Sequence, residues 1–187
     1  MRRARKLAIY TVVAICLLGI TRTAIPPTFR APTRRFASDA KQIMMALQFY
    51  ANAFKDRFPT DNDVALLPQY MDGPGIQALL PHNVDAPDDI DSWSPDRRAS
   101  WLRKHSAWVL LQGGRKQSSI ASTNTAVALY RKFDDSERSV VVGFTDGHVR
   151  LMRVRDARRM IEEREGRTIE EIEAAQRQKW EELDAFE

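Results

Sequence analysis

The chain has 187 residues, of which 43% are hydrophobic and 29% charged, a composition typical of one folded domain with short appendages. These values exclude a wholly disordered chain and a membrane protein with many spans. The formal net charge of +4 is small and the basic residues are not interleaved with aromatic ones, so nucleic-acid binding is not expected. The single cysteine, Cys16, excludes an intramolecular disulfide and a cysteine metal cluster.

The first 24 residues have the layout of an export and anchoring segment. A basic leader, residues 1–6, precedes the uncharged apolar stretch 7–20. Arg22 stands at the minus-three position of the nearest cleavage site, where signal peptidase substrates carry a small residue. This arrangement favours an uncleaved signal anchor over 7–24, with cleavage as the alternative. Charge alone does not set its orientation, because the basic residues that follow balance those of the leader.

A proline-rich segment separates the anchor from the next predicted helix. The prolines between positions 26 and 32 predict a linker over 25–37, since proline lacks a backbone donor and disfavours helix before it. Ser38 is a suitable N-cap for a helix that runs to about Asp56. Helical spacing places six side chains on one face that is expected to pack against a sheet: Ile43, Ala46, Leu47, Tyr50, Ala53 and Phe54.

The middle of the chain, residues 60–95, is rich in proline and glycine and is predicted to form loops and short turns. Ser94 and Pro95 have the pattern of an N-cap and a first helical residue, which predicts a short helix containing Trp101. The apolar run 107–111 then predicts a buried strand.

Three further strands are predicted over 126–130, 140–145 and 148–154, where β-branched and aromatic residues are frequent. An apolar face of these strands is expected to pack on the helix that begins at Ser38. The chain is therefore predicted to have an α+β fold: an N-terminal anchor helix, a second amphipathic helix packed on a small antiparallel sheet, and a charged C-terminal helix.

Asp146 and Gly147 lie between the last two predicted strands. They suit a two-residue type I′ turn, in which both central residues have positive φ. This turn predicts a register that places four apolar side chains on one face, in two cross-strand pairs: Phe144 with Val149, and Val142 with Leu151.

Residues 155–187 are predicted to form a charged C-terminal helical extension. Gly166 interrupts the helical pattern, and Thr168 with Glu171 forms a capping box that restarts it. A narrow apolar stripe continues after the restart: Ile169, Ile172, Trp180 and Leu183. Two uses of this stripe stay open, contact with the domain itself and pairing with a helix of a partner chain.

Two sequence signatures, in this order, resemble the pseudopilins of type II secretion and other prepilin-like proteins. The first is the end of the predicted helix with Tyr50, followed by Phe58 and Pro59. The second is the strand-turn-strand motif that contains Phe144, Asp146, Gly147 and His148. Together the signatures cover about residues 38–152.

The resemblance implies a pseudopilin-like globular domain over 38–154. It further implies single-pass attachment to the cytoplasmic (inner) membrane, with the C-terminal domain on the extracytoplasmic side. The expected partners are membrane lipid, through the N-terminal helix, and pilin-like or secretion-system proteins of a type II secretion or type IV pilus-like assembly. No small-molecule substrate is identified. The chain departs from the family in lacking a prepilin peptidase site, in its proline linker, and in having Ser136 where some members have a histidine.

Other functional classes stay open. The missing peptidase site favours, as the alternative, a membrane-tethered or periplasmic binding module unrelated to filament assembly. Asp146 beside His148 would suit general acid–base chemistry in a periplasmic enzyme, but a hairpin turn explains both residues. Because no catalytic motif defines a reaction, the sequence predicts no enzyme and no catalytic residue.

Four aspartates crowd one loop of the middle segment: Asp85, Asp88, Asp89 and Asp91. Carboxylates are the hard oxygen ligands that calcium prefers, but their spacing does not match an EF-hand. A solvated acidic loop is the ordinary explanation. The resemblance adds calcium as a weaker hypothesis, because some pseudopilins order a loop with this ion; no other cofactor is predicted.

Overall fold

The computed structural model describes residues 27–71, 75–117, 126–133 and 137–185. The chain divides into two units, residues 1–34 and residues 35–187. The predicted basic leader, the predicted signal anchor and Cys16 lie outside the described residues. Among the described helices, none is both long and apolar enough to cross a membrane.

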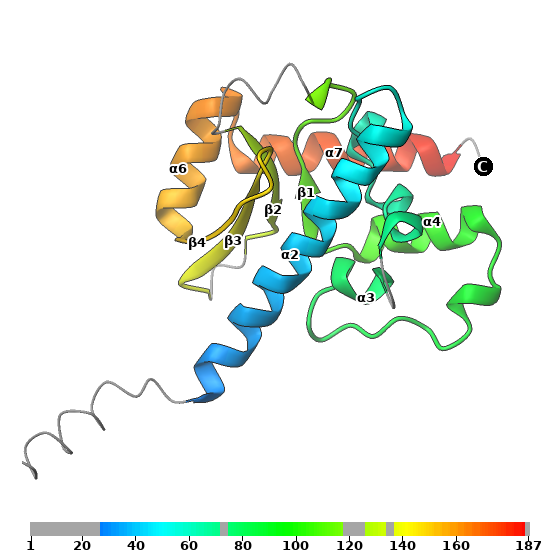
Figure 1. The fold of residues 1–187 in the computed structure, drawn as a ribbon, viewed down its shortest axis with the longest axis horizontal. Coiled ribbons are helices and arrows are strands. Elements are labelled where there is room, and N and C mark those ends of the chain that lie inside the picture. The colour runs from blue at the N-terminus through cyan, green and yellow to red at the C-terminus, as the bar shows by residue number, and fades with distance from the viewer. Residues whose placement is uncertain (1–26, 72–74, 118–125, 134–136, 186–187) are drawn as a thin grey trace, which may run out of the picture. The chain divides into compact units, whose positions relative to one another are not determined.

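Helix α2 extends from Pro27 to Ala53 (Figure 1). The predicted linker over 25–37 and the predicted helix start at Ser38 are therefore wrong from Pro27 onward. Proline is tolerated at the first position of a helix, where the backbone N–H has no intrahelical acceptor. Pro32 removes one backbone hydrogen bond further inside, and the other bonds of this 27-residue helix outweigh that loss.

One face of α2 is buried. It includes the predicted residues Ile43, Ala46, Leu47 and Tyr50, together with Phe36, Ala40, Met44 and Ala51. The prediction that Ala53 and Phe54 belong to this face is wrong, since Ala53 is exposed and the Phe54 side chain is 48% exposed, stacked on Tyr50. The helix ends at Ala53 because Lys55 (φ 55°) and Asp56 (φ 65°) adopt left-handed backbone, so helical spacing no longer applies beyond it.

Short helices fill the middle of the chain, as the loops and turns predicted there suggest. They are η1 (Thr60–Asn62), η2 (Val64–Leu66), η3 (Pro68–Tyr70), α3 (Gly75–Leu79) and η4 (Ile90–Ser92). The helix predicted from Ser94 and Pro95 is confirmed as α4 (Pro95–His105). The Ser94 hydroxyl accepts a hydrogen bond from the backbone N–H of Arg97 at 3.4 Å, which is the capping interaction expected there.

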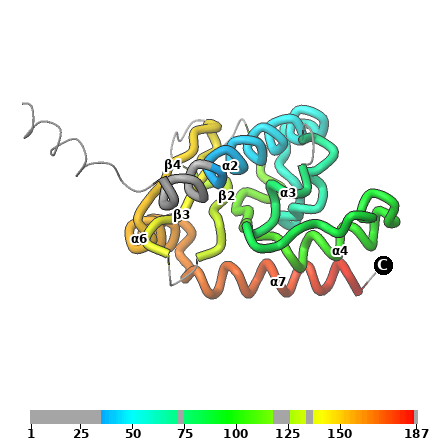
Figure 2. Tube along the Cα trace, turned by 90° about the horizontal axis from the view of Figure 1, so that it is seen from below, coloured from blue at the N-terminus to red at the C-terminus, as the bar shows by residue number. Residues whose placement is uncertain are grey.

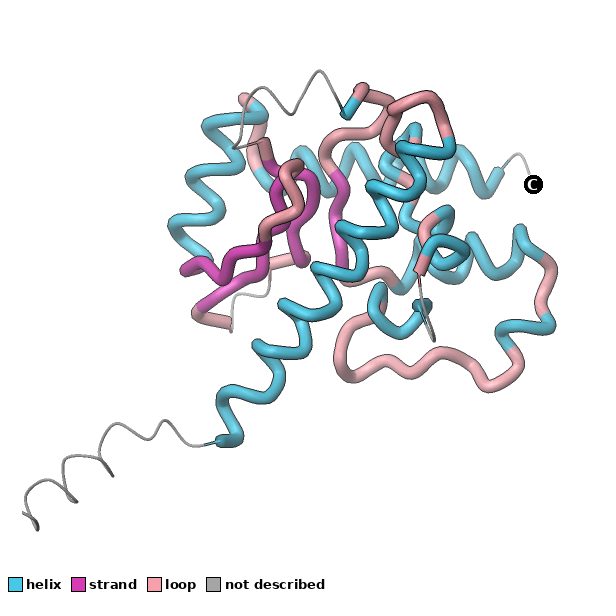
Figure 3. The backbone as a smooth tube through the Cα atoms, viewed as in Figure 1, coloured by secondary structure: helices cyan, strands magenta, loops and turns pink. Residues whose placement is uncertain are grey.

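Four antiparallel strands form one sheet in the order β1-β2-β3-β4 (Figure 3). They are β1 (Trp108–Leu110), β2 (Val127–Arg131), β3 (Ser139–Phe144) and β4 (Val149–Arg153). All four predicted strands are confirmed, each with ends within one residue of the prediction. The α+β class is confirmed with them, for the part of the chain that the structure describes.

The turn between β3 and β4 differs from the predicted type I′ turn. The Phe144 N–H donates to the His148 carbonyl at 2.9 Å, which leaves a three-residue loop of Thr145, Asp146 and Gly147. Gly147 has φ 88°, whereas Asp146 keeps a negative φ. Because the loop has a third residue, Asp146 does not need a left-handed backbone. Only Gly147 adopts it, and glycine does so without strain.

The longer loop shifts the strand register by one residue. Val142 pairs with Arg150, and Leu151 pairs with Val141, so the predicted face of four apolar side chains does not form. Val142 and Phe144 instead belong to an apolar cluster with the C-terminal helices, whereas Val141 belongs to the cluster that contains the buried face of α2. The prediction of which sheet face meets α2 is therefore corrected.

Helices α6 (Val154–Glu165) and α7 (Ile169–Ala185) lie across the sheet from α2 (Figure 2). Gly166 ends α6 with φ 65°, and the predicted capping box is confirmed by reciprocal hydrogen bonds between Thr168 and Glu171 of 2.8 and 3.2 Å. Buried side chains of both helices pack on the sheet: Ala157, Ile161, Ile169 and Ile172. The residues predicted as an extension therefore belong to the same unit as the sheet, over 155–185.

Candidate functional site

The predicted signature residues of the helix end are structural. Tyr50 is 8% exposed, and its ring meets the Tyr70 ring edge-on at 5.6 Å. Phe58 and Pro59 are buried, and the backbone N–H of Phe58 donates to the Arg115 carbonyl at 3.0 Å. Phe58 belongs to the apolar cluster on the α2 side of the sheet and Phe144 to the cluster on the other side, whereas Gly147 of the second signature lies against Gln48 of α2.

Asp146 and His148 form a local pair at the hairpin turn. One Asp146 carboxylate oxygen accepts from the His148 backbone N–H at 3.1 Å and also contacts the Nδ1 atom of the ring. The His148 ring stacks on Phe144 with centroids 4.2 Å apart. Slight burial acts to raise the pKa of Asp146, but the hydrogen bonds from His148 outweigh it and lower that pKa. These contacts fix the turn, which is the geometric role expected of an aspartate at that position.

The acidic loop of the middle segment offers no coordination site. Asp85, Asp88, Asp89 and Asp91 are all exposed, and Asp91 lies 3.9 Å from the Arg98 guanidinium. Within the described residues, no group of three or more acidic, histidine or cysteine side chains is placed to hold a metal ion. The weaker calcium hypothesis therefore gains no geometric support.

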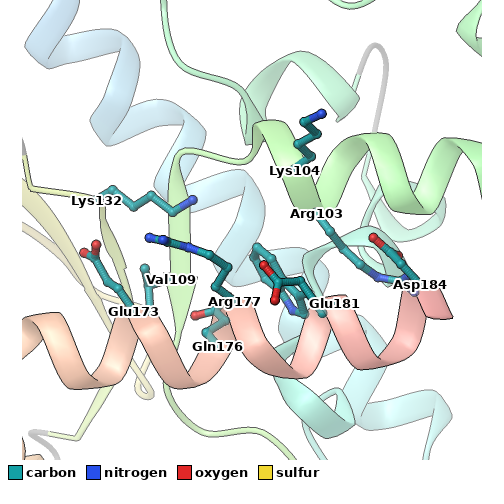
Figure 4. Close-up of a pocket in the computed structure, with 10 residues that line it drawn as sticks. Arg103, Lys104, Val109, Lys132, Glu173, Gln176, Arg177, Glu181 and Asp184 are labelled. Carbon is teal, nitrogen blue, oxygen red and sulfur yellow. The ribbon is translucent and has the colours of Figure 1, made fainter.

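A cavity of about 390 Å³ lies along α7, where this helix passes α4 and the ends of β1 and β2 (Figure 4). We call it the α7 cavity. Ten residues line it: Arg103, Lys104, Val109, Lys132, Glu173, Gln176, Arg177, Trp180, Glu181 and Asp184. Helical spacing explains the contribution of α7, because positions three, four and seven residues apart face the same side. Neither Asp146 nor His148 lines this cavity.

Two buried polar side chains in the α7 cavity have no hydrogen-bond partner among the described residues. Gln176 is 6% exposed, and both its amide nitrogen and its amide oxygen are unpaired. Trp180 is also 6% exposed, and its indole N–H is unpaired. A buried polar group without a partner costs about 1–3 kcal/mol. These atoms are themselves buried, so they face the packed interior behind the wall of the cavity.

Opposite charges face each other at one end of the α7 cavity. Lys132, Glu173 and Arg177 extend toward one another there (Figure 4). Lys132 donates to the Ser106 carbonyl at 2.8 Å, and burial lowers the pKa of its ammonium group, opposed by the negative charge of Glu173. Burial raises the pKa of the Glu173 carboxyl, opposed by the positive charge of Lys132. Both groups are therefore partly removed from water, and interactions with them are stronger than at an open surface.

The other end of the α7 cavity is held by an ion-pair network. The Arg103 guanidinium, which α4 supplies, is buried and lies 3.1 Å from Asp63 and 2.6 Å from Asp184. Asp63 precedes η2 and also accepts from the Ala65 backbone N–H at 2.9 Å. The Arg103 guanidinium thereby joins three elements that are distant in sequence: α4, the start of η2, and α7.

No family model, curated protein or solved structure matches this chain.

Sequence reasoning missed the α7 cavity, although one signal for it was present. The apolar stripe of α7 runs through Ile169, Ile172, Trp180 and Leu183, and helical spacing requires a member near position 176. That member is Gln176, a polar residue within an apolar stripe. Lys132 and Arg103 gave no comparable signal, because only the tertiary structure brings their segments to α7.

Proposed function

We propose that this protein is a membrane-anchored, pseudopilin-like structural component of a type II secretion or type IV pilus-like assembly, acting through protein contacts. The observation that carries the proposal is the arrangement of α2. One face of this helix packs on a small antiparallel sheet, while its outer face leaves Met45 and Phe49 each 52% exposed.

The exposed pair on α2 is suited to contact with another helix. Met45 and Phe49 are four residues apart and therefore adjacent on the helix surface. Isolated exposed apolar side chains are common, but two large neighbouring ones on a long helix form a patch that a partner can cover. The uninterrupted course of α2 through Pro32 also supports the proposal, because the resemblance implies a long continuous helix rather than a break at this point.

Membrane anchoring is tested by mass spectrometry of the mature N-terminus from isolated membranes, combined with protease accessibility in intact and permeabilised cells. We expect an intact Met1. We also expect protease to reach the C-terminal domain in permeabilised cells but not in intact cells. A new N-terminus beyond Ala24 with the domain in the soluble fraction would contradict anchoring and would remove most of the support for the pseudopilin role.

Assembly through α2 is tested by the double substitution Met45→Ser and Phe49→Ser. Blue native electrophoresis of gently solubilised membranes should show the wild type in a complex larger than the 21.4 kDa chain and the variant as the free chain. The free energy of unfolding should change by only about 0.5 kcal/mol per site, because both side chains are largely exposed. The matched control replaces Gln42 and Asn52, exposed polar residues of the same helix, with serine. A variant that stays in the complex would refute the α2 contact.

The second candidate is a membrane-tethered or periplasmic binding module, and the α7 cavity is the observation that favours it. Its volume of about 390 Å³ lies within the range of roughly 300–1,000 Å³ that small-molecule sites occupy, and charged side chains line it. A periplasmic enzyme is a weaker form of the same candidate, since the Asp146 and His148 pair lies at a turn and outside the α7 cavity.

A further inference from the structure

Strand β4 forms an open edge of the sheet (Figure 1). Among the described residues, only β3 pairs with it. The opposite edge strand, β1, is buried at all three positions, whereas Arg150, Leu151 and Arg153 of β4 are exposed. Leu151 is 52% exposed, although its pairing with Val141 places it on the α2 side of the sheet. An uncovered edge strand is a template on which another extended chain can pair.

The hydrogen bonds of the last hairpin show which backbone groups of β4 face the open edge. The Val154 N–H, directly after β4, donates to the Arg138 carbonyl at 3.2 Å. In an antiparallel ladder, positions that bond to the neighbouring strand alternate with positions whose N–H and C=O point to the other side. The register between β3 and β4 is unbroken, so the even-numbered residues of β4 bond to β3. The backbone N–H and C=O groups of Val149 and Leu151 therefore point to the open edge.

The open edge of β4 is basic. Arg150 and Arg153 are exposed within the strand, and the exposed side chain of Arg155 follows directly after it. Within the described residues, neither Arg150 nor Arg153 forms an ion pair with a carboxylate. These arginines oppose pairing with a second copy of the chain, because positive charges would meet across the new ladder. The uncompensated charge instead favours a strand that carries carboxylates.

We propose that β4 binds an extended acidic segment of a partner protein, which adds an antiparallel strand to the sheet. Backbone groups of the segment form hydrogen bonds with Val149 and Leu151. An apolar side chain of the segment lies opposite Leu151, and carboxylates lie opposite Arg150 and Arg153. In this mode of recognition the backbone bonds supply affinity and the side-chain contacts supply specificity. The proposal identifies a further contact surface and does not depend on the pseudopilin-like role.

Fluorescence anisotropy of the purified full chain in mild detergent tests the added strand with a labelled peptide. The probe is a capped Glu-Thr-Val-Glu-Val peptide with an uncharged fluorophore. In the register that sets its central valine opposite Leu151, its two glutamates lie opposite Arg153 and Arg150. We expect saturable binding of this peptide to the wild type.

Methylation of single backbone nitrogens of the peptide separates strand pairing from simple charge attraction. A methyl group on the central valine nitrogen removes the N–H that bonds to Leu151, which should weaken binding at least about tenfold. The matched control carries the methyl group on the second glutamate nitrogen, opposite Arg150. Because that N–H points away from β4, the control should keep its affinity within about twofold.

Charge reversal in the protein locates the segment on β4. The double substitution Arg150→Glu and Arg153→Glu should weaken binding of the peptide about tenfold, because two attractive charge pairs become repulsive. A peptide with lysine in place of both glutamates should bind this variant and not the wild type. The matched control is Arg164→Glu with Arg167→Glu, which changes the net charge equally at exposed positions outside β4. It should leave the affinity of the original peptide unchanged.

Four results would overturn the proposal. Equal affinities of the two methylated peptides would show that charge alone holds them, as on a basic patch for any polyanion. Binding that survives reversal of Arg150 and Arg153 would place the segment elsewhere on the chain. A wild-type dimer that the peptide dissociates in analytical ultracentrifugation would assign the edge to a second copy. No saturable binding of the original peptide would leave β4 as a solvated edge. None of these results bears on anchoring or on the α2 contact, which are read from the mature N-terminus and from native electrophoresis.

Discussion

Replacing Asp63 with alanine is expected to lower the free energy of unfolding by about 3–5 kcal/mol, the usual effect of removing one partner of a buried ion pair. The Asp63 side chain is 6% exposed and lies 3.1 Å from the Arg103 guanidinium, which is 7% exposed. Without Asp63, Arg103 keeps only part of its compensating charge in a poorly solvated position. The backbone N–H of Ala65 also loses its acceptor, so the start of η2 is weakened as well. Urea unfolding followed by circular dichroism measures the change.

Asp184→Ala is the matched control for this experiment. Asp184 contacts the same guanidinium at 2.6 Å, but its side chain is 34% exposed, so its truncation opens this side of Arg103 to water while Asp63 continues to compensate the charge. Its removal should lower the free energy of unfolding by about 1 kcal/mol or less. If both substitutions had equal effects on the free energy of unfolding, burial would not explain the contribution of the Asp63 contact.

Replacing Ile43 with alanine is expected to lower the free energy of unfolding by about 2–5 kcal/mol, as in other large-to-small core substitutions. Ile43 is 0% exposed and belongs to the apolar cluster that joins α2 to the sheet. The substitution leaves a cavity that close-packed neighbours cannot fill completely. The same urea titration gives the value, and an unchanged slope would show that the native state keeps its compactness.

Met45→Ala removes a side chain of similar size from the opposite face of the same helix. Because Met45 is 52% exposed, its truncation should change the free energy of unfolding by about 0.5 kcal/mol at most. A large effect of Met45→Ala in the isolated protein, or a small effect of Ile43→Ala, would show that α2 presents a different face to the sheet.

Local sequence patterns were sufficient for elements that are set by local chemistry. Ser94 before Pro95, and Thr168 with Glu171, predicted helix starts correctly, because capping depends on hydrogen bonds within a few residues. The strand positions were also predictable, since β-branched runs bounded by turn residues are a local signal. Pro32 misled the same reasoning, because the cost of one proline is small beside the cooperativity of a long helix.

The strand register could not be settled in the same way. An Asp-Gly pair is compatible with a two-residue loop and with a three-residue loop, and the difference of one residue exchanges the two faces of β4. The outcome depends on what covers each face of the sheet, with α2 on one side and α6 and α7 on the other. That information is not local to the turn.

The sequence by itself determined the α+β class, the positions of the strands, the caps of α4 and α7 and the buried centre of α2, because each follows from hydrogen bonding or periodicity within a short window. Only the tertiary structure decided which sheet face meets which helix, and only it assembled the α7 cavity. Lys132, Arg103 and Gln176 come from three separate segments, and the contacts that join them arise when those segments pack around a common core. Their chemistry depends on burial and proximity, which no pattern along the chain specifies.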